Sequence, residues 1–87
     1  MSTLVAYMWW CGDDECDCTQ PVIERYTERG RFFNIERLWE GSFHSQRDPD
    51  ERAQQEAEMM EAAARFGIEL SREDEYSDLY GRKEEAP

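Results

Sequence analysis

A helix between Asp48 and Gly67 is the element that most constrains how this chain can fold. Asp48 can accept hydrogen bonds from the first free N–H groups of a helix, and Pro49 suits the first helical position. Gly67 suits the position after the last turn, so we expect a helix over about residues 49–66. The side chains expected to face the interior are Ala53, Ala57, Met59, Met60, Ala63, Ala64 and Phe66. Those expected to face water are Gln54, Glu58, Glu61 and Arg65.

Three segments before this helix have the composition of β-strands. Residues 3–10 carry aromatic and β-branched side chains on both faces, which is typical of a strand covered on both sides. Residues 20–29 are ambiguous, because Pro21 could open a short helix while Arg29-Gly30 suits a hairpin turn; we favour the hairpin. Residues 31–45 alternate with a period of two, with a bulge allowed at Gly41. This alternation predicts one face with Phe33, Ile35, Arg37 and Trp39, and another with Phe32, Asn34, Glu36 and Leu38.

The remaining residues predict a second, shorter helix. Ser71 followed by Asp74 suggests a helix cap, and Gly81 suits the C-terminal end. Tyr76, Leu79 and Tyr80 provide an apolar edge. The fold class that we expect is α+β: a small antiparallel three-stranded sheet, one long helix (about 49–66) and a short C-terminal helix (about 72–80) on one face of the sheet. Residues 1–81 would form a single domain, and residues 82–87 a flexible tail.

The charge of the chain excludes several classes of partner. Its 87 residues include 21 Asp and Glu against 10 Lys and Arg, which gives a formal net charge of -11. Direct binding to nucleic acid or to an anionic membrane is not expected, because both need a dense basic patch and Lys83 is the only lysine. The apolar run Leu4–Cys11 is too short to span a bilayer, and Met1-Ser2-Thr3 has no basic residue of a signal peptide, so we expect a cytoplasmic protein.

Cysteine and histidine offer one candidate metal site. Three thiolates and one imidazole form a known tetrahedral zinc ligand set, and this chain contains Cys11, Cys16, Cys18 and His44. The alternatives are three small buried thiols, which is common for cysteine, or a disulfide or redox role. No Cys-His nucleophilic pair and no glycine-rich phosphate loop is evident, since the five glycines are scattered singly. We therefore expect no catalytic residues and no cofactor apart from this zinc hypothesis.

The acidic side chains gather in two parts of the chain and form the candidate partner-binding set. Its members are Asp13, Asp14, Glu15, Asp17, Asp50, Glu51, Glu58, Glu61, Glu73, Asp74, Glu75 and Asp78. If they share one side, their carboxylates would be spaced much like phosphates and could occupy a groove that normally holds nucleic acid. The alternative is that the charge serves only solubility. Eleven aromatic residues cannot all be buried in so small a domain, so some are expected to contact a partner or a second copy of the chain.

Two short motifs resemble known sequences. Residues 16–21 (Cys-Asp-Cys-Thr-Gln-Pro) and 38–43 (Leu-Trp-Glu-Gly-Ser-Phe) are similar to motifs of small uncharacterised bacteriophage proteins. In size and acidity the chain is also similar to phage-encoded inhibitors of host defence, including anti-CRISPR proteins that imitate DNA. This resemblance implies a non-catalytic inhibitor in the host cytosol. Such an inhibitor would occlude the basic nucleic-acid-binding surface of a host defence complex.

Overall fold

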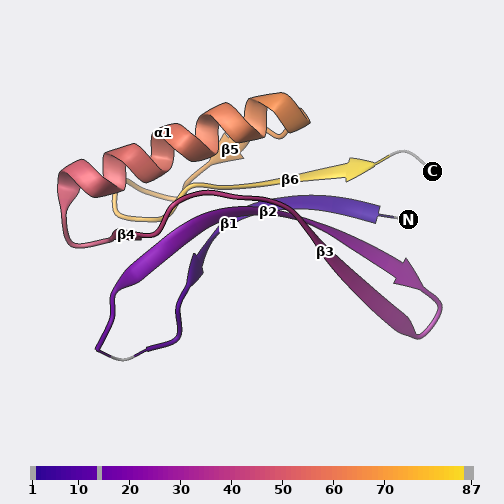
Figure 1. The fold of residues 1–87 in the computed structure, drawn as a ribbon. Helices are drawn as coiled ribbons and strands as arrows, with labels where there is room; N and C mark the ends of the chain where they lie inside the picture. The colour runs from indigo at the N-terminus through magenta and orange to yellow at the C-terminus, as the bar shows by residue number, and fades with distance from the viewer. Residues whose placement is uncertain (1, 14, 86–87) are drawn as a thin grey trace.

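The structure is a computed structural model that describes residues 2–13 and 15–85. Its elements in chain order are β1 (Ser2–Trp10), β2 (Cys18–Arg29), β3 (Phe32–Glu40), β4 (His44–Ser45), α1 (Pro49–Phe66), β5 (Leu70–Ser71) and β6 (Tyr80–Glu85). Within the described residues the strands form one antiparallel sheet in the order β3-β2-β1-β6-β5, and β4 pairs with β2. The helix α1 lies across one face of this sheet, and no helix among the residues that the structure describes covers the other face (Figure 1).

The fold class expected from the sequence is wrong in two respects. The sheet has six strands over the described residues rather than three, and residues 72–80 do not form a helix. Asp74 caps a turn there, because its carboxylate accepts hydrogen bonds from the backbone N–H groups of Tyr76 and Ser77. The chain then enters β6, so residues 82–85, expected in a tail, lie in a strand paired with β1. Over residues 2–13 and 15–85 the molecule is therefore mostly β, with one helix.

The strand β2 resolves the ambiguity of residues 20–29 in favour of the hairpin. It pairs with β1 on one side, from Ser2 opposite Thr27 to Trp10 opposite Thr19. Pro21 is tolerated inside it because its missing N–H lies on the side where no ladder bond is needed. Pro21 faces the gap between β3, which ends opposite Val22, and β4, which begins opposite Thr19. In this gap the Gly41 N–H donates a 2.8 Å hydrogen bond to the Pro21 carbonyl.

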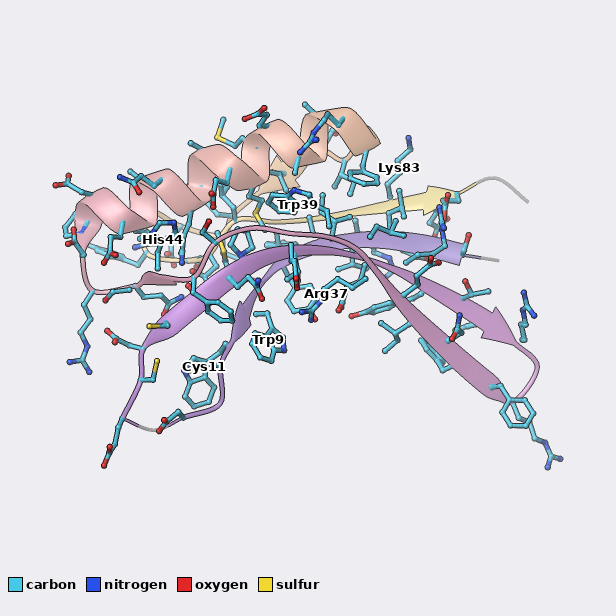
Figure 2. All side chains as sticks on the ribbon, in the orientation of Figure 1. Trp9, Cys11, Arg37, Trp39, His44 and Lys83 are labelled. Atoms are coloured by element: carbon cyan, nitrogen blue, oxygen red, sulfur yellow. The ribbon has the colours of Figure 1, made fainter. Side chains whose placement is uncertain are left out.

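The β2–β3 hairpin turns at Gly30, which has a φ of 61° and stands at the first central position of a two-residue loop. A β-bulge then interrupts the pairing, since Glu24 lies opposite Arg37 while Ile23 lies opposite Trp39. Leu38 is the extra residue, so the period of two is broken there. The expected face containing both Arg37 and Trp39 is therefore wrong: Trp39 packs toward the core beneath α1, and Arg37 lies on the opposite face (Figure 2).

The helix begins and ends as expected. The Asp48 carboxylate accepts hydrogen bonds from the N–H groups of Asp50 and Glu51, and Gly67 adopts a left-handed conformation at the C-terminal end. The buried side of the helix differs from the expected one. It consists of Gln55, Met59, Ala62 and Ala63, whereas Ala53, Ala57, Met60 and Ala64 are exposed. Within the described residues no helix is both long and apolar enough to cross a membrane.

The core lies between α1 and the sheet. Its buried members are Leu4, Ala6, Ile23, Met59, Ala62, Ala63, Ile68 and Leu79. A buried polar contact also joins the two layers: the Gln55 amide donates hydrogen bonds to the carbonyl oxygens of Thr19, at 2.6 Å, and His44, at 3.1 Å. The Thr19 hydroxyl donates to Gln55 Oε1 at 3.0 Å. These contacts hold the N-terminal half of α1 in position above β2 and β4.

Candidate functional site: an acidic helix layer and an aromatic sheet face

The charge of the protein is divided between the two layers of the fold. Residues 48–78, which contain α1, β5 and the loop before β6, hold eleven acids and three arginines, a net charge of -8 out of -11. We call this segment the helix layer. Residues 24–40, which contain most of the β2–β3 hairpin, hold four acids and four arginines and are neutral overall. Most of the net charge thus belongs to the helix layer, and residues 13–17 add four further acids.

Four acids of the candidate set extend into solvent from the helix layer. The side chains of Asp50, Glu61, Glu73 and Glu75 are exposed and make no hydrogen bond or ion pair with the described residues. Two of them lie on α1 and two on the loop that follows β5. The helix itself is held to this loop, because Glu56 accepts a 2.9 Å ion pair from Arg72. Arg52 also donates to the carbonyl oxygens of Tyr76 and Ser77.

Other acids of the candidate set stabilise the fold instead. Asp74 caps the turn described above, and Asp78 accepts hydrogen bonds from the Gln46 amide. Glu58 accepts from Ser42 N–H at 3.3 Å and lies 3.9 Å from His44 Nε2, while Glu51 lies 3.8 Å from His44 Nδ1. These contacts join α1 to the β3–β4 connection. Three of the proposed partner-binding residues, Asp74, Asp78 and Glu58, therefore have hydrogen-bond partners within the fold, and Glu51 lies against the histidine.

The second acidic group lies away from the helix. The loop that joins β1 to β2 extends on the side of the sheet opposite α1 (Figure 1). Within it, Asp17 forms a 3.0 Å ion pair with Arg47, and Asp13 accepts a hydrogen bond from Glu15 N–H. Asp14 lies outside the described residues. The structure therefore does not bring Asp13, Glu15 and Asp17 together with the helix-layer acids, and the sequence-based set divides into two.

The proposed zinc ligands are also divided between the two faces of the sheet. His44 points toward the helix carboxylates, and Cys11 lies on the loop on the opposite side (Figure 2). The cysteines are near one another: Cys18 N–H donates to Cys16 Sγ at 3.4 Å, and Cys11 N–H donates to the Cys18 carbonyl. Among the residues that the structure describes, no group of three or more His, Cys, Asp and Glu is arranged to hold a metal. The zinc hypothesis stays a prediction that this geometry does not support.

Sequence reasoning missed a buried carboxylate on the sheet face away from α1. Glu24 is only 5% exposed and accepts hydrogen bonds from Arg37, at 3.0 and 3.1 Å, and from the Tyr7 hydroxyl, at 2.6 Å. Burial and the Glu24 carboxylate raise the pKa of Tyr7 far above its usual value. The guanidinium of Arg37 also lies 5.4 Å from the Trp9 ring centroid. The pairing of Tyr7 with Glu24 could have been suspected from the sequence, because side chains alternate along β1 and β2 and the hairpin pairing places these two residues on one face.

The same face contains a groove of about 540 Å³. Its walls include Val5 of β1, Tyr26 of β2, Phe33 of β3, and Tyr80 and Arg82 of β6. Phe33 and Tyr80 are among the exposed large side chains of the protein. The uncovered face is therefore rich in aromatic side chains and contains the buried Glu24–Arg37 ion pair, so it differs in character from the helix layer.

This arrangement offers carboxylates for binding on one side and aromatic side chains on the other. The acids of the helix layer can attract a basic surface over a distance, and the aromatic face can bury apolar area at short range. Comparisons with protein-family models, with curated proteins and with solved structures found no match to this chain.

Proposed function

We propose that this protein is a small, non-catalytic interaction protein whose helix layer docks on a basic, nucleic-acid-binding surface of a host defence complex and occludes it. The observation that carries the proposal is the net charge of -8 on residues 48–78. A surface of one sign steers an oppositely charged partner and accelerates association. The exposed carboxylates of Asp50, Glu61, Glu73 and Glu75 would make the contacts.

Rigidity supports this assignment. Binding costs conformational entropy whenever flexible groups must be ordered, so a fixed array of charges binds better than a disordered acidic tail. Gln55 attaches α1 to the sheet, and the Arg72–Glu56 ion pair attaches it to the following loop. The acids on α1 and on that loop are therefore presented from one packed layer, as a mimic of a nucleic-acid backbone requires.

The proposal is tested by capture followed by charge-matched variants. The immobilised protein is exposed to a bacterial lysate that has been depleted of nucleic acid, and bound complexes are eluted by salt or by duplex DNA. Retained nucleic-acid-binding complexes should elute between about 50 and 500 mM salt, because the screening length falls there from over 10 Å to a few ångströms. Duplex DNA should displace the same complexes.

The decisive comparison uses two triple variants with equal net charge. The first neutralises the helix layer through Asp50→Asn, Glu61→Gln and Glu73→Gln. The second, the matched control, neutralises three exposed acids outside it through Glu15→Gln, Glu28→Gln and Glu84→Gln. The first should weaken binding of the captured complex about tenfold or more, mainly through slower association, and the control should change it much less. Equal losses in the two variants would show that only total charge matters and would refute the helix layer as the binding surface.

A further inference from the structure

The strand β3 is a free edge of the sheet. It pairs with β2 on one side, and no described strand pairs with it on the other. Opposed residues of an antiparallel pair alternate between exchanging backbone hydrogen bonds and not doing so. In a two-residue hairpin the closing pair, here Arg29 and Phe32, exchanges these bonds. The alternation then turns the backbone N–H and C=O groups of Phe33, Ile35 and Arg37 outward, away from β2.

The side chains in the first half of this edge are unusually apolar for a free strand. Phe32 is 79% exposed, Phe33 is 63% exposed and Ile35 is 57% exposed. Natural proteins usually protect a free edge with charged side chains, proline or a very short strand. β3 has nine residues and no proline, whereas the strand at the other edge, β5, has two residues. The charged side chains of β3, Glu36, Arg37 and Glu40, all lie in its second half. Its first half, Phe32–Ile35, is therefore a free edge without a charge or a proline, and another strand can pair with it.

Charge identifies which strand can occupy the edge. Two copies of a protein with a net charge of -11 repel each other over most of their surface. The segment 24–40 is neutral, because Arg25, Arg29, Arg31 and Arg37 balance its four acids. Arg37 is held by Glu24 and Glu40, and Arg25 by Glu36 and Glu85. The β3 edge is therefore the place where two copies can approach each other with the least repulsion.

We propose that the protein forms a two-fold dimer in which β3 pairs antiparallel with β3 of a second copy, with Ile35 on the axis. This register places Ile35 opposite Ile35 and pairs the outward backbone groups of Phe33 with those of Arg37. On the face toward α1 it sets Asn34 opposite Glu36, and the regular pairing stops before the bulge at Leu38. No like charges are opposed within β3, and Phe33 lies across from an arginine that can stack on its ring.

The neighbouring registers fit less well. Centring the pairs on Asn34 would set Arg31 opposite Arg37, and like charges directly opposed are destabilising. Centring them on Glu36 would require regular pairing through the bulge at Leu38. The Ile35 register ends where that bulge begins, so the bulge limits the length of the contact.

The two-fold axis of such a dimer is perpendicular to the sheet. Both copies of α1 then lie on the same face of one continuous sheet, and the two helix layers form a double acidic surface. This inference goes beyond the proposed function and does not depend on it, because the dimer forms without any partner. Salt separates the two: screening weakens the docking of the helix layer on a basic surface but relieves repulsion between two copies.

The test measures molar mass by light scattering during size exclusion, over a range of protein concentrations. The wild type should show a dimer, and Ile35→Lys should raise the dissociation constant about tenfold or more, because two like charges then meet on the axis. The matched control is Met60→Lys on the outer face of α1, where the side chain is 59% exposed, close to the 57% of Ile35. This control should remain a dimer. A wild type that is monomeric at about 1 mM, the weak end of specific association, overturns the proposal.

Cross-linking tests the register. In a background of Cys11→Ser, Cys16→Ser and Cys18→Ser, oxidation should link two Ile35→Cys chains, because hydrogen-bonded antiparallel pairs have Cα atoms about 5.5 Å apart, within disulfide range. Phe33→Cys should not link to itself, since the two positions lie about 13 Å apart in this register. Efficient linkage through Phe33→Cys, or none through Ile35→Cys in a chain of dimeric mass, overturns the Ile35 register.

Discussion

Replacing Gln55 by leucine tests the central packing argument, that a buried amide attaches α1 to the sheet. Gln55 is 1% exposed and takes part in three hydrogen bonds, two to carbonyl oxygens and one from the Thr19 hydroxyl. Leucine has a similar volume, so the change removes these bonds without opening a large cavity. It leaves the carbonyl oxygens of Thr19 and His44 buried without this donor.

The expected loss follows from those groups. Each buried polar group left without a partner costs about 1–3 kcal/mol, and the hydrophobic side chain returns about 1 kcal/mol. We expect a net loss of about 2–4 kcal/mol in the free energy of unfolding. A domain of this size has a total of roughly 4–13 kcal/mol. The melting temperature should fall by about 10 °C or more.

The assay is urea denaturation followed by tryptophan fluorescence, because Trp39 packs against the core that would come apart. All variants are compared at one protein concentration, so that self-association contributes equally. The matched control is Gln54→Leu, one residue earlier on the exposed side, which should change stability by less than about 0.5 kcal/mol. If Gln55→Leu is as stable as Gln54→Leu, the buried hydrogen bonds do not hold the helix, and the argument fails.

Two further changes probe the sheet. Because its pKa is raised above the usual value of 10.0, Tyr7 contributes stability that is present below about pH 10 and is lost as the pH rises beyond it. Tyr7→Phe should therefore cost about 1–1.5 kcal/mol at neutral pH and reduce the alkaline loss in pH-dependent melting, whereas an unchanged alkaline slope would contradict this role for Tyr7. At Gly81 an added Cβ would lie 2.6 Å from Ile68 Cγ2 and even closer to the Glu69 carbonyl, so Gly81→Ala should cost about 2 kcal/mol or more in urea denaturation. Gly12→Ala, with no atom within 4 Å of its Cβ, should cost only about 1 kcal/mol from its positive φ, and equal losses at both glycines would argue against crowding at β6.

Local chemistry predicted the helix ends and the hairpin. Asp48, Pro49 and Gly67 act through atoms within a few residues of themselves, so their roles can be read without knowing the rest of the fold. The same holds for Gly30, whose positive φ suits the turn between β2 and β3. These are the features for which the sequence was a sufficient guide.

Long-range packing decided the features that were mispredicted. β6 has a polar sequence, and it lies inside the sheet because β1 and β5 both pair with it, which no local pattern reveals. The buried side of α1 was mispredicted because apolarity was used to choose it. Gln55 is buried through its hydrogen bonds, while Met60 and three alanines remain exposed. The bulge at Leu38 similarly reverses Trp39 without any glycine or proline at that position.

The candidate site was predictable in composition but not in arrangement. Counting acids along the chain showed that they gather in two parts, one of which contains the acids of the helix layer. It could not show that Asp74 and Asp78 are used within the loop, or that Asp17 pairs with Arg47 on the other side of the sheet. Glu24 was overlooked because it stands among other charged residues of β2 and resembles an exposed acid until its partners Tyr7 and Arg37 are placed around it.

The central position of β6 gives the protein a particular order of events during its synthesis. A ribosome releases β1, β2, β3 and α1 before residues 80–85, so one edge of β1 stays open while the nascent chain lengthens. At about 5–20 residues per second, the interval between β1 and β6 is on the order of 10 s. During that time Leu4 and Ala6 lack the neighbouring strand that later covers that edge. A chaperone that binds the nascent chain during this interval would prevent it from pairing with another chain before β6 joins the sheet.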